Sequence, residues 1–132
     1  MLAADVVISE IMHHPIDPAN PGVAAIGEEY IELYNKGTTA ADLTNWRFDR
    51  GVDFTFTGGS LGVGQYLVVA ADLAKFQQKY PGVTNVVGGW LGRLSNSSET
   101  IELVDALGDT VDEVTYADEG DWAVRRKRVY PI

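Results

Sequence analysis

Residues 27–35, GEEYIELYN, decide the fold, because their side chains alternate in character with a period of two. In an extended strand, successive side chains point to opposite faces. Glu29, Ile31 and Leu33 therefore share one face. Because Ile31 and Leu33 are large and apolar, this face predicts a strand that packs against a hydrophobic core.

The other face of this strand carries Tyr30, Glu32 and Tyr34. These residues form a stripe of aromatic and acidic side chains that is expected to point away from the core. One interpretation is an exposed face whose tyrosines cover neighbouring strands. The other is a binding face, because exposed tyrosine suits contacts with proteins or glycans. The sequence leaves both interpretations open, and the three residues are the candidate binding residues.

The composition is that of one globular domain. The chain has 132 residues, of which 45% are hydrophobic and 22% charged, enough for a single domain with its own core. The formal net charge of −9 repels nucleic acid phosphates and anionic lipids, so neither is expected as a partner. Cationic groups, basic protein surfaces and neutral glycans remain open. The absence of cysteine excludes disulfides and cysteine-ligated metals.

The chain shows no expected membrane or targeting segment. No apolar run approaches the ~20 residues that a membrane-spanning helix needs, so no membrane insertion is expected. Residues 1–12 pass directly into an alternating pattern, without the basic and apolar regions of a signal peptide.

Many short segments alternate like strands and are separated by glycine-rich or proline-rich turns. The proline-rich residues 13–22, HHPIDPANPG, are predicted to form a loop, and residues 106–109, ALGD, a hairpin turn between the last two strands. This pattern predicts an all-β fold, an antiparallel β-sandwich. The expected strands are residues 6–12, 29–34, 43–48, 53–56, 65–71, 100–105 and 110–116.

One short helix is expected between the strands. Asp72 suits the N-cap position, and Pro81 with Gly82 ends the helical pattern. Within residues 73–80, Phe76 and Tyr80 fall on one face together with Leu73. We therefore predict a helix over residues 73–80 that packs through these side chains.

Three pairs of aspartates are candidate calcium ligands. Calcium takes six to eight oxygen ligands, and none of the pairs lies in the spacing of an EF-hand loop. A second interpretation is that aspartates at such positions serve turns, as expected for a hairpin. No cofactor is expected, with calcium as the open alternative. The pairs are Asp49 with Asp53, Asp105 with Asp109, and Asp118 with Asp121, the last together with Glu119.

No catalytic constellation is legible. Glu10, His13 and His14 suggest a metal site, but adjacent side chains of an extended chain point to opposite sides, and the helical spacing of a zinc protease is absent. A hydrolase that uses Glu28 or Glu29 would lack a nucleophile paired with a base. The glycines of residues 58–64 precede a strand, whereas a phosphate-binding loop precedes a helix. The chain is therefore not expected to be an enzyme.

The basic residues Arg125–Arg128, RRKR, stand out in an acidic chain. Lysine and arginine on an edge strand prevent unwanted pairing with other chains. We expect this segment to be an edge strand, a surface-paired segment or the start of a linker. The predicted domain therefore spans residues 1–124, followed by the basic residues 125–132.

The order of several motifs resembles the lamin tail domain family, in particular bacterial members appended to exported or surface proteins. The motifs span residues 6–122 and are VVISEIMHHP, GEEYIELYNKG, DLTNWRFDRG, FTF, GQYLVVAAD, GRLSNSSETIELVDALGDTVDEVTY and GDW. The resemblance implies an immunoglobulin-like sandwich and a non-catalytic role. It also implies that Trp46 is the tryptophan buried between the sheets. The positions implied to be structural are Glu10, Glu29, Asn35, Trp46, Asn96 and Trp122.

The resemblance implies an accessory module that tethers a larger exported or envelope-associated protein. Its expected partner is a protein or a glycan, including other domains of the same chain. The alternative is an adhesion or glycan-binding sandwich stabilised by calcium, since acidic residues are frequent in the loops at the strand ends.

Overall fold

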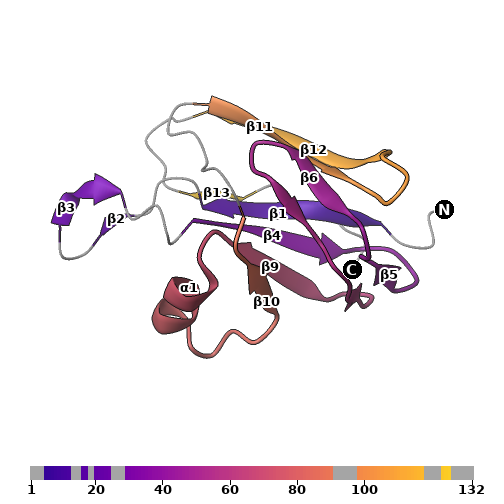
Figure 1. Cartoon of the computed structure of the whole chain (residues 1–132), viewed down its shortest axis with the longest axis horizontal. Coiled ribbons are helices and arrows are strands. Elements are labelled where there is room, and N and C mark those ends of the chain that lie inside the picture. The colour runs from indigo at the N-terminus through magenta and orange to yellow at the C-terminus, as the bar shows by residue number, and fades with distance from the viewer. Residues whose placement is uncertain are drawn as a thin grey trace.

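The computed structural model describes residues 5–12, 16–17, 20–24, 29–90, 98–117 and 123–125. Most of them lie in two β-sheets stacked face to face, with one helix on the outside (Figure 1). The elements are β1 (Val6–Met12), β2 (Ile16–Asp17), β3 (Asn20–Ala24), β4 (Tyr30–Asn35), β5 (Ala41–Asp42), β6 (Arg47–Arg50), β7 (Phe54–Thr55), β8 (Ser60–Leu61), β9 (Tyr66–Ala70), α1 (Leu73–Lys79), β10 (Val86–Gly88), β11 (Ser98–Val104), β12 (Thr110–Ala117) and β13 (Ala123–Arg125).

The larger sheet has the strand order β10-β9-β4-β1-β13, and the smaller has the order β12-β11-β6-β7. Every pairing in them is antiparallel except that of β9 with β10, which is parallel because α1 connects these two strands. Two short pairs, β2 with β3 and β5 with β8, stand apart from the sheets. The expected antiparallel β-sandwich with one short helix is thus confirmed.

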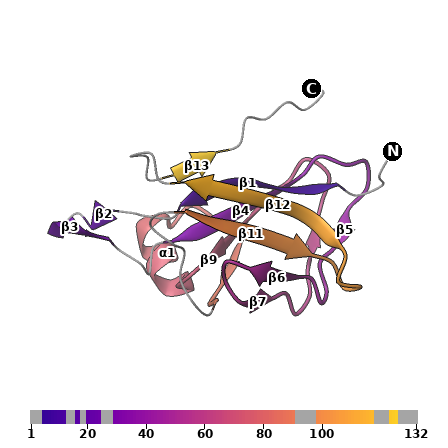
Figure 2. The same ribbon diagram turned by 90° about the horizontal axis from the view of Figure 1, so that it is seen from above.

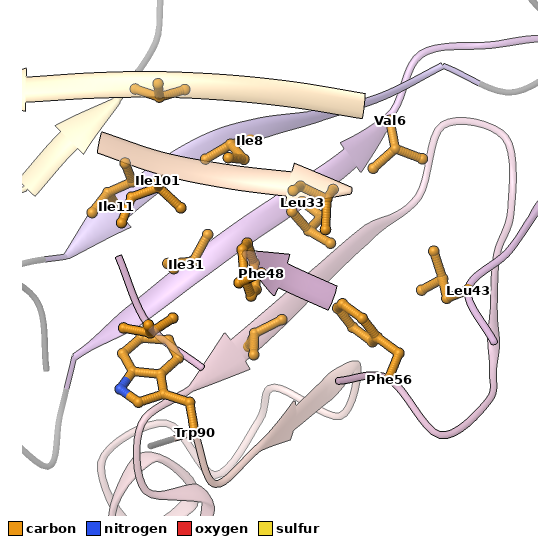
Figure 3. Packing of buried hydrophobic residues seen from close by; sticks show 14 of the residues in the cluster. Val6, Ile8, Ile11, Ile31, Leu33, Leu43, Phe48, Phe56, Trp90 and Ile101 are labelled. Atoms are coloured by element: carbon orange, nitrogen blue, oxygen red, sulfur yellow. The ribbon is translucent and has the colours of Figure 1, made fainter. Parts of the chain in front are cut away.

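The inner faces of the two sheets enclose one hydrophobic core (Figure 3). Ile31 and Leu33 of β4 are fully buried there, as their alternation predicts. Phe48 of β6 and Ile101 of β11 meet them from the smaller sheet. Each large apolar side chain buried in this way stabilises the fold by about 1.5–3 kcal/mol.

A β-bulge in β1 sets the direction of the side chains in the first strand. Ile8 pairs with Leu33 and Glu10 pairs with Glu32, so Ser9 is an extra residue without a partner across the ladder. The shift lets Ile8 and Ile11, three residues apart, both face the core. It also places Glu10 beside Glu32 on the outer face of the sheet.

The bulge also connects the two sheets. The backbone N–H of Ile8 donates a 2.8 Å hydrogen bond to Oδ2 of Asp112, which lies on β12. Figure 2 shows β12 crossing over β1, and this hydrogen bond joins the two strands. The side chain of Asp112 therefore satisfies a backbone group of the irregular strand.

Several expected elements differ from the structure. The expectation that residues 13–22 form only a loop was wrong, because β2 and β3 pair there as a short hairpin. Pro21 is tolerated in β3 because a short edge strand leaves backbone N–H groups unpaired. Similarly, β5 and β8 pair within segments expected to be turns. The strands over residues 6–12 and the final hairpin are confirmed.

The tryptophan expected between the sheets is not the one that lies there. Trp46 is only partly buried and packs against the core from its margin. Its N–H donates to the carbonyl of Leu43, so Trp46 closes a turn and precedes β6 instead of standing inside it. Trp90 lies in the core, 6% exposed, and its indole Nε1 has no hydrogen-bond partner among the described residues.

Candidate functional site

The helix α1 covers part of the outer face of the larger sheet, on the side turned away from β11 and β12 (Figure 1). The Oδ1 of Asp72 accepts a 3.1 Å hydrogen bond from the N–H of Lys75, which confirms the predicted N-cap. Phe76 is the buried residue of the helix and packs against Val68 and Ala70 of β9. The helix is thus fixed to the sheet through a small second core.

Tyr30, from the predicted stripe, lies beneath this helix. Its ring meets Phe76 edge-on at 5.6 Å between centroids and Tyr80 edge-on at 6.4 Å. Phe76 and Tyr80 are themselves 4.9 Å apart. Edge-to-face pairs of this kind contribute about 0.5–1.5 kcal/mol beyond their buried area. The three rings form one aromatic cluster, which we call the helix cluster.

The chain after the helix turns back toward the sheet. Tyr80 is the C-cap residue, and its carbonyl accepts a 3.1 Å hydrogen bond from the N–H of Val83. Pro81 favours this turn because proline cannot continue the helical hydrogen bonding. Val83 is thereby brought against Val68, at the rim of the helix cluster.

A pocket of about 130 Å³ remains between α1 and the sheet, partly open to solvent. Strands β1, β4 and β9 form its floor, and the helix with the following turn forms its side. Its lining combines two carboxylates with aromatic and aliphatic side chains. The described residues that line it are Glu10, Tyr30, Glu32, Val68, Phe76, Tyr80 and Val83.

The two carboxylates of the pocket come from paired positions. Glu10 and Glu32 are direct cross-strand partners of β1 and β4, and the bulge at Ser9 turns Glu10 toward the outer face, to which Glu32 points by the alternation of β4. Like charges directly opposite each other are unfavourable in a sheet. Hydrogen bonds offset part of this cost: the Ser9 hydroxyl donates to Oε1 of Glu32 at 2.7 Å, and the Tyr30 hydroxyl donates to Glu10.

The environment of Tyr30 keeps its hydroxyl protonated. Burial raises the pKa of Tyr30 well above its usual range, and the negative charge of Glu10 raises this pKa further. The neighbouring Tyr80 and Glu32 act in the same direction. The phenol therefore remains a hydrogen-bond donor, and its ring remains neutral.

The remaining end of the stripe has different surroundings. Tyr34 packs on its cross-strand partner Tyr66, with ring centroids 4.5 Å apart. Neither tyrosine lines the pocket. Of the three candidate binding residues, the structure thus brings Tyr30 and Glu32 into the pocket and leaves Tyr34 outside it. All three side chains are half-buried, so the stripe is less exposed than its sequence indicates.

Asn35, implied to be structural, is fully buried and uses its whole side-chain amide. Its Nδ2 donates to the carbonyls of Thr39 and Leu61, each at 2.9 Å. Its Oδ1 accepts from the N–H groups of Gly37 at 2.9 Å and Asp5 at 3.3 Å. The amide therefore joins three segments of the chain at the end of β4.

Glu10 and Glu29, two further positions implied to be structural, lie on opposite faces of the larger sheet. Glu10 reaches the pocket, whereas Glu29 is 1% exposed on the core side at the start of β4. The Glu29 backbone carbonyl accepts a 2.9 Å hydrogen bond from the N–H of Ala71. Asn96, Trp122, Glu28, His13 and His14 lie outside the described residues.

The candidate calcium ligands are dispersed. Asp49 forms an ion pair with Arg47, at 3.5 Å. Oδ1 of Asp105 accepts hydrogen bonds from the N–H groups of Leu107 and Asp109 at the hairpin turn, as the turn interpretation predicts.

Across the described ranges, no group of three or more histidine, cysteine, aspartate or glutamate residues could hold a metal ion. Asp118 and Asp121 lie outside those ranges, and Asp53 is exposed.

Sequence reasoning missed the pocket, although it identified most of its parts. Phe76 and Tyr80 were expected on one face of the helix, and Tyr30 with Glu32 on one face of a strand. What the sequence did not indicate is that these two faces meet. The available signal was the apolar side chain of Val68 on the outer face of β9, which indicates that another element packs on that face.

Comparison with known families identifies the family of this two-layer domain. A family model described as Lamin Tail Domain matches residues 2–118. A comparison with curated proteins gives no match. Among the described residues no helix is long and apolar enough to cross a membrane. Lamin tail domains are immunoglobulin-like, non-enzymatic interaction domains, in agreement with the observed sandwich. The chain belongs to the lamin tail domain family.

Proposed function

We propose that this domain is a non-catalytic interaction module that tethers or positions a larger, exported or envelope-associated protein, and that it contacts its partner through the pocket beside α1. The observation that carries the proposal is the pocket itself. It lies on the outer face of a sheet whose inner face is occupied by the core. An outward pocket with aromatic walls is where a partner side chain can be buried.

The chemistry of the pocket supports binding more than catalysis. Its described lining includes no histidine, cysteine, serine or lysine. Ser9 contacts Glu32, but Ser9 is fully buried, so a substrate could not reach its hydroxyl. A nucleophile requires both an activating base and access for the substrate. The family membership and the resemblance to bacterial members attached to exported proteins support the tethering role.

The calcium-dependent adhesion alternative has less support. The described residues provide no acidic cluster with enough oxygen ligands for calcium. The frequent acidic residues are instead spread over both sheets and their turns.

Fractionation of the larger protein in its own cells tests the proposal. We would replace Val83, at the pocket rim, with arginine, because this side chain would fill the pocket. Val63 is 53% exposed in a turn and does not line the pocket, so Val63→Arg adds the same charge elsewhere.

We expect the Val63→Arg protein to remain in the fraction of the unmodified protein and the Val83→Arg protein to move to the soluble fraction. Equal behaviour of the two variants, with both domains folded by circular dichroism, would reject the pocket as the contact surface.

A further inference from the structure

We propose that the pocket recognises an arginine side chain on a basic segment of the partner protein. This inference rests on the proposed function, because it names the group that the pocket face would bind. It draws on the paired carboxylates, the aromatic wall and the size of the pocket.

The charge of the pocket favours a cation. Glu10 and Glu32 face the same space from neighbouring strands, and the fold keeps them there through the bulge at Ser9. The Tyr30 hydroxyl donates a hydrogen bond to Glu10 and the Ser9 hydroxyl donates one to Glu32, and neither donor carries a charge. A cation placed between the two carboxylates removes the like-charge repulsion as well as adding its own attraction. The overall charge of −9 adds a field of the same sign.

The aromatic wall favours a flat cation that can stack. Tyr30, Phe76 and Tyr80 form an aromatic cluster that lines the same pocket as the two carboxylates. Cations are attracted to aromatic faces, and arginine is found there more often than lysine. Within the domain, Nζ of Lys79 already lies 5.8 Å from the centroid of the Tyr80 ring, so this ring accepts a cation from one side.

The shape of the pocket selects arginine over a larger ligand. Its volume of about 130 Å³ is below the ~300–1,000 Å³ typical of small-molecule sites. It suits one side-chain end. The guanidinium fork can bond both carboxylates at once, whereas an ammonium is a point charge. Val68 and Val83 would then contact the aliphatic part of the arginine side chain.

The basic end of this chain is the competing occupant. The backbone of Arg125 pairs with Glu10 across β13 and β1, at the margin of the same sheet. The backbone of Arg125, the first of these basic residues, therefore lies close to a pocket residue, and the experiment has to separate a partner arginine from the chain's own arginines.

The test is a heteronuclear NMR titration of the 132-residue chain with the peptide acetyl-Gly-Arg-Gly-amide. The control peptide carries norleucine in place of arginine. We expect saturable shifts with millimolar affinity at Tyr30, Val68 and Val83 with the arginine peptide, and no saturation with norleucine. The affinity should fall as ionic strength rises, because the guanidinium and the pocket carboxylates would be partly exposed to solvent.

Matched variants locate the binding. Glu32→Gln and Glu113→Gln remove the same charge, but Glu113 lies on the smaller sheet, where its carboxylate is 3.8 Å from Arg50. We expect Glu32→Gln to weaken the peptide affinity about tenfold, as for the loss of a charge-assisted hydrogen bond. Glu113→Gln should change it less than about twofold. Val83→Arg, which keeps Glu32, provides a second test if Glu32→Gln disturbs the fold, and should abolish binding.

Three results would overturn the inference. One is the absence of saturable shifts in the folded protein. Another is equal weakening by Glu32→Gln and Glu113→Gln, which would indicate general attraction to the acidic surface. The third is binding only after Arg125, Arg126, Lys127 and Arg128 are changed to glutamine, which would identify the chain's own segment as the occupant.

The fractionation experiment can reject the proposed function independently of the peptide titration. If the peptide binds but Val83→Arg does not release the larger protein, the proposed function is wrong while arginine recognition stands.

Discussion

Tyr30 and Tyr34 project from the same face of β4, four residues apart, yet the structure uses them differently. Tyr30 lies under α1 within the helix cluster and lines a pocket with Glu32. Tyr34 packs on Tyr66 in the neighbouring strand, away from the pocket. The same residue type at equivalent positions thus lines a pocket at one end of the strand and packs on a neighbouring ring at the other. The elements that fold over each end make the difference.

The two ends are also held by different kinds of interaction. At the Tyr34 end, the buried amide of Asn35 gathers three segments through hydrogen bonds. At the Tyr30 end, Phe76 attaches the helix through apolar contacts. Removing one partner of a buried polar network is strongly destabilising, because the other groups remain buried without hydrogen-bond partners. Truncating an apolar side chain reduces stability by an amount that grows with the volume of the cavity that it leaves. Mutations at the two ends should therefore differ in how much stability they remove and in how much of the domain they affect.

The largest effect is expected for Asn35→Ala. It leaves two backbone carbonyls and two backbone N–H groups without their side-chain partner. Since each unsatisfied buried group costs about 1–3 kcal/mol and some can recruit water, we expect a loss of about 3–4 kcal/mol in the free energy of unfolding. Urea denaturation at neutral pH measures it.

Gln65→Ala is the matched control for this variant. Gln65 is also an amide and accepts a 2.8 Å hydrogen bond from Gly62, but it is exposed. Its loss should cost less than about 1 kcal/mol. Equal costs for the two variants would show that burial of the Asn35 amide is not what stabilises this end.

A smaller and more local effect is expected for Phe76→Ala. The second core is small, so the cost should be near the lower end of the range for phenylalanine, about 3 kcal/mol. Hydrogen exchange should show lost protection in α1, while the amides next to Tyr34 and Tyr66 keep theirs. Gln77→Ala, at an exposed helix position, is the control and should be nearly neutral. A uniform loss of protection across the domain would contradict the separation of the two ends.

The sequence predicted much of this fold because alternation is a local property. The burial of Ile31 and Leu33, the cap at Asp72 and the last hairpin each depend on residues close together in the chain. The bulge at Ser9 was not predicted, because it depends on how β1 pairs with β4. As a result, the neighbouring positions of Glu10 and Glu32, and with them the candidate site, could not be read from the sequence.

The two tryptophans illustrate the same limit. The family resemblance implied that Trp46 lies in the core, but it occupies the margin because a turn closes at that residue. Trp90 follows two glycines and carried no strand signal of its own, yet it is buried. The residue type indicates that a tryptophan side chain favours burial, whereas tertiary contacts decide which tryptophan is buried.

The pH dependence of Tyr30→Phe sharpens the comparison at the Tyr30 end. The pKa of Tyr30 is raised in the folded protein, first by burial and then by Glu10. A raised pKa means that the folded state holds the proton more tightly, so this contribution to stability is complete below the unfolded value of about 10 and is lost at higher pH.

At neutral pH, Tyr30→Phe should therefore be about 1–2 kcal/mol less stable than the unmodified protein, since it loses the hydrogen bond to Glu10. The difference should shrink as pH rises above about 10. Urea denaturation of both proteins at pH 7, 9, 10 and 11 measures it, because other ionising groups affect both proteins equally. A difference that stays constant over this range would contradict the shifted pKa.

The smallest effect is expected for Tyr34→Phe, the equivalent change at the other end of the stripe. The variant keeps the ring on Tyr66, and Tyr34 is half-buried beside that partner. Its stability should change by less than about 1 kcal/mol, and the affinity for the arginine peptide by less than about twofold, because the ring lies outside the pocket. If Tyr34→Phe weakened the peptide as much as Glu32→Gln, the recognition surface would extend along the whole stripe. The division of β4 into a binding end and a packing end would then be wrong.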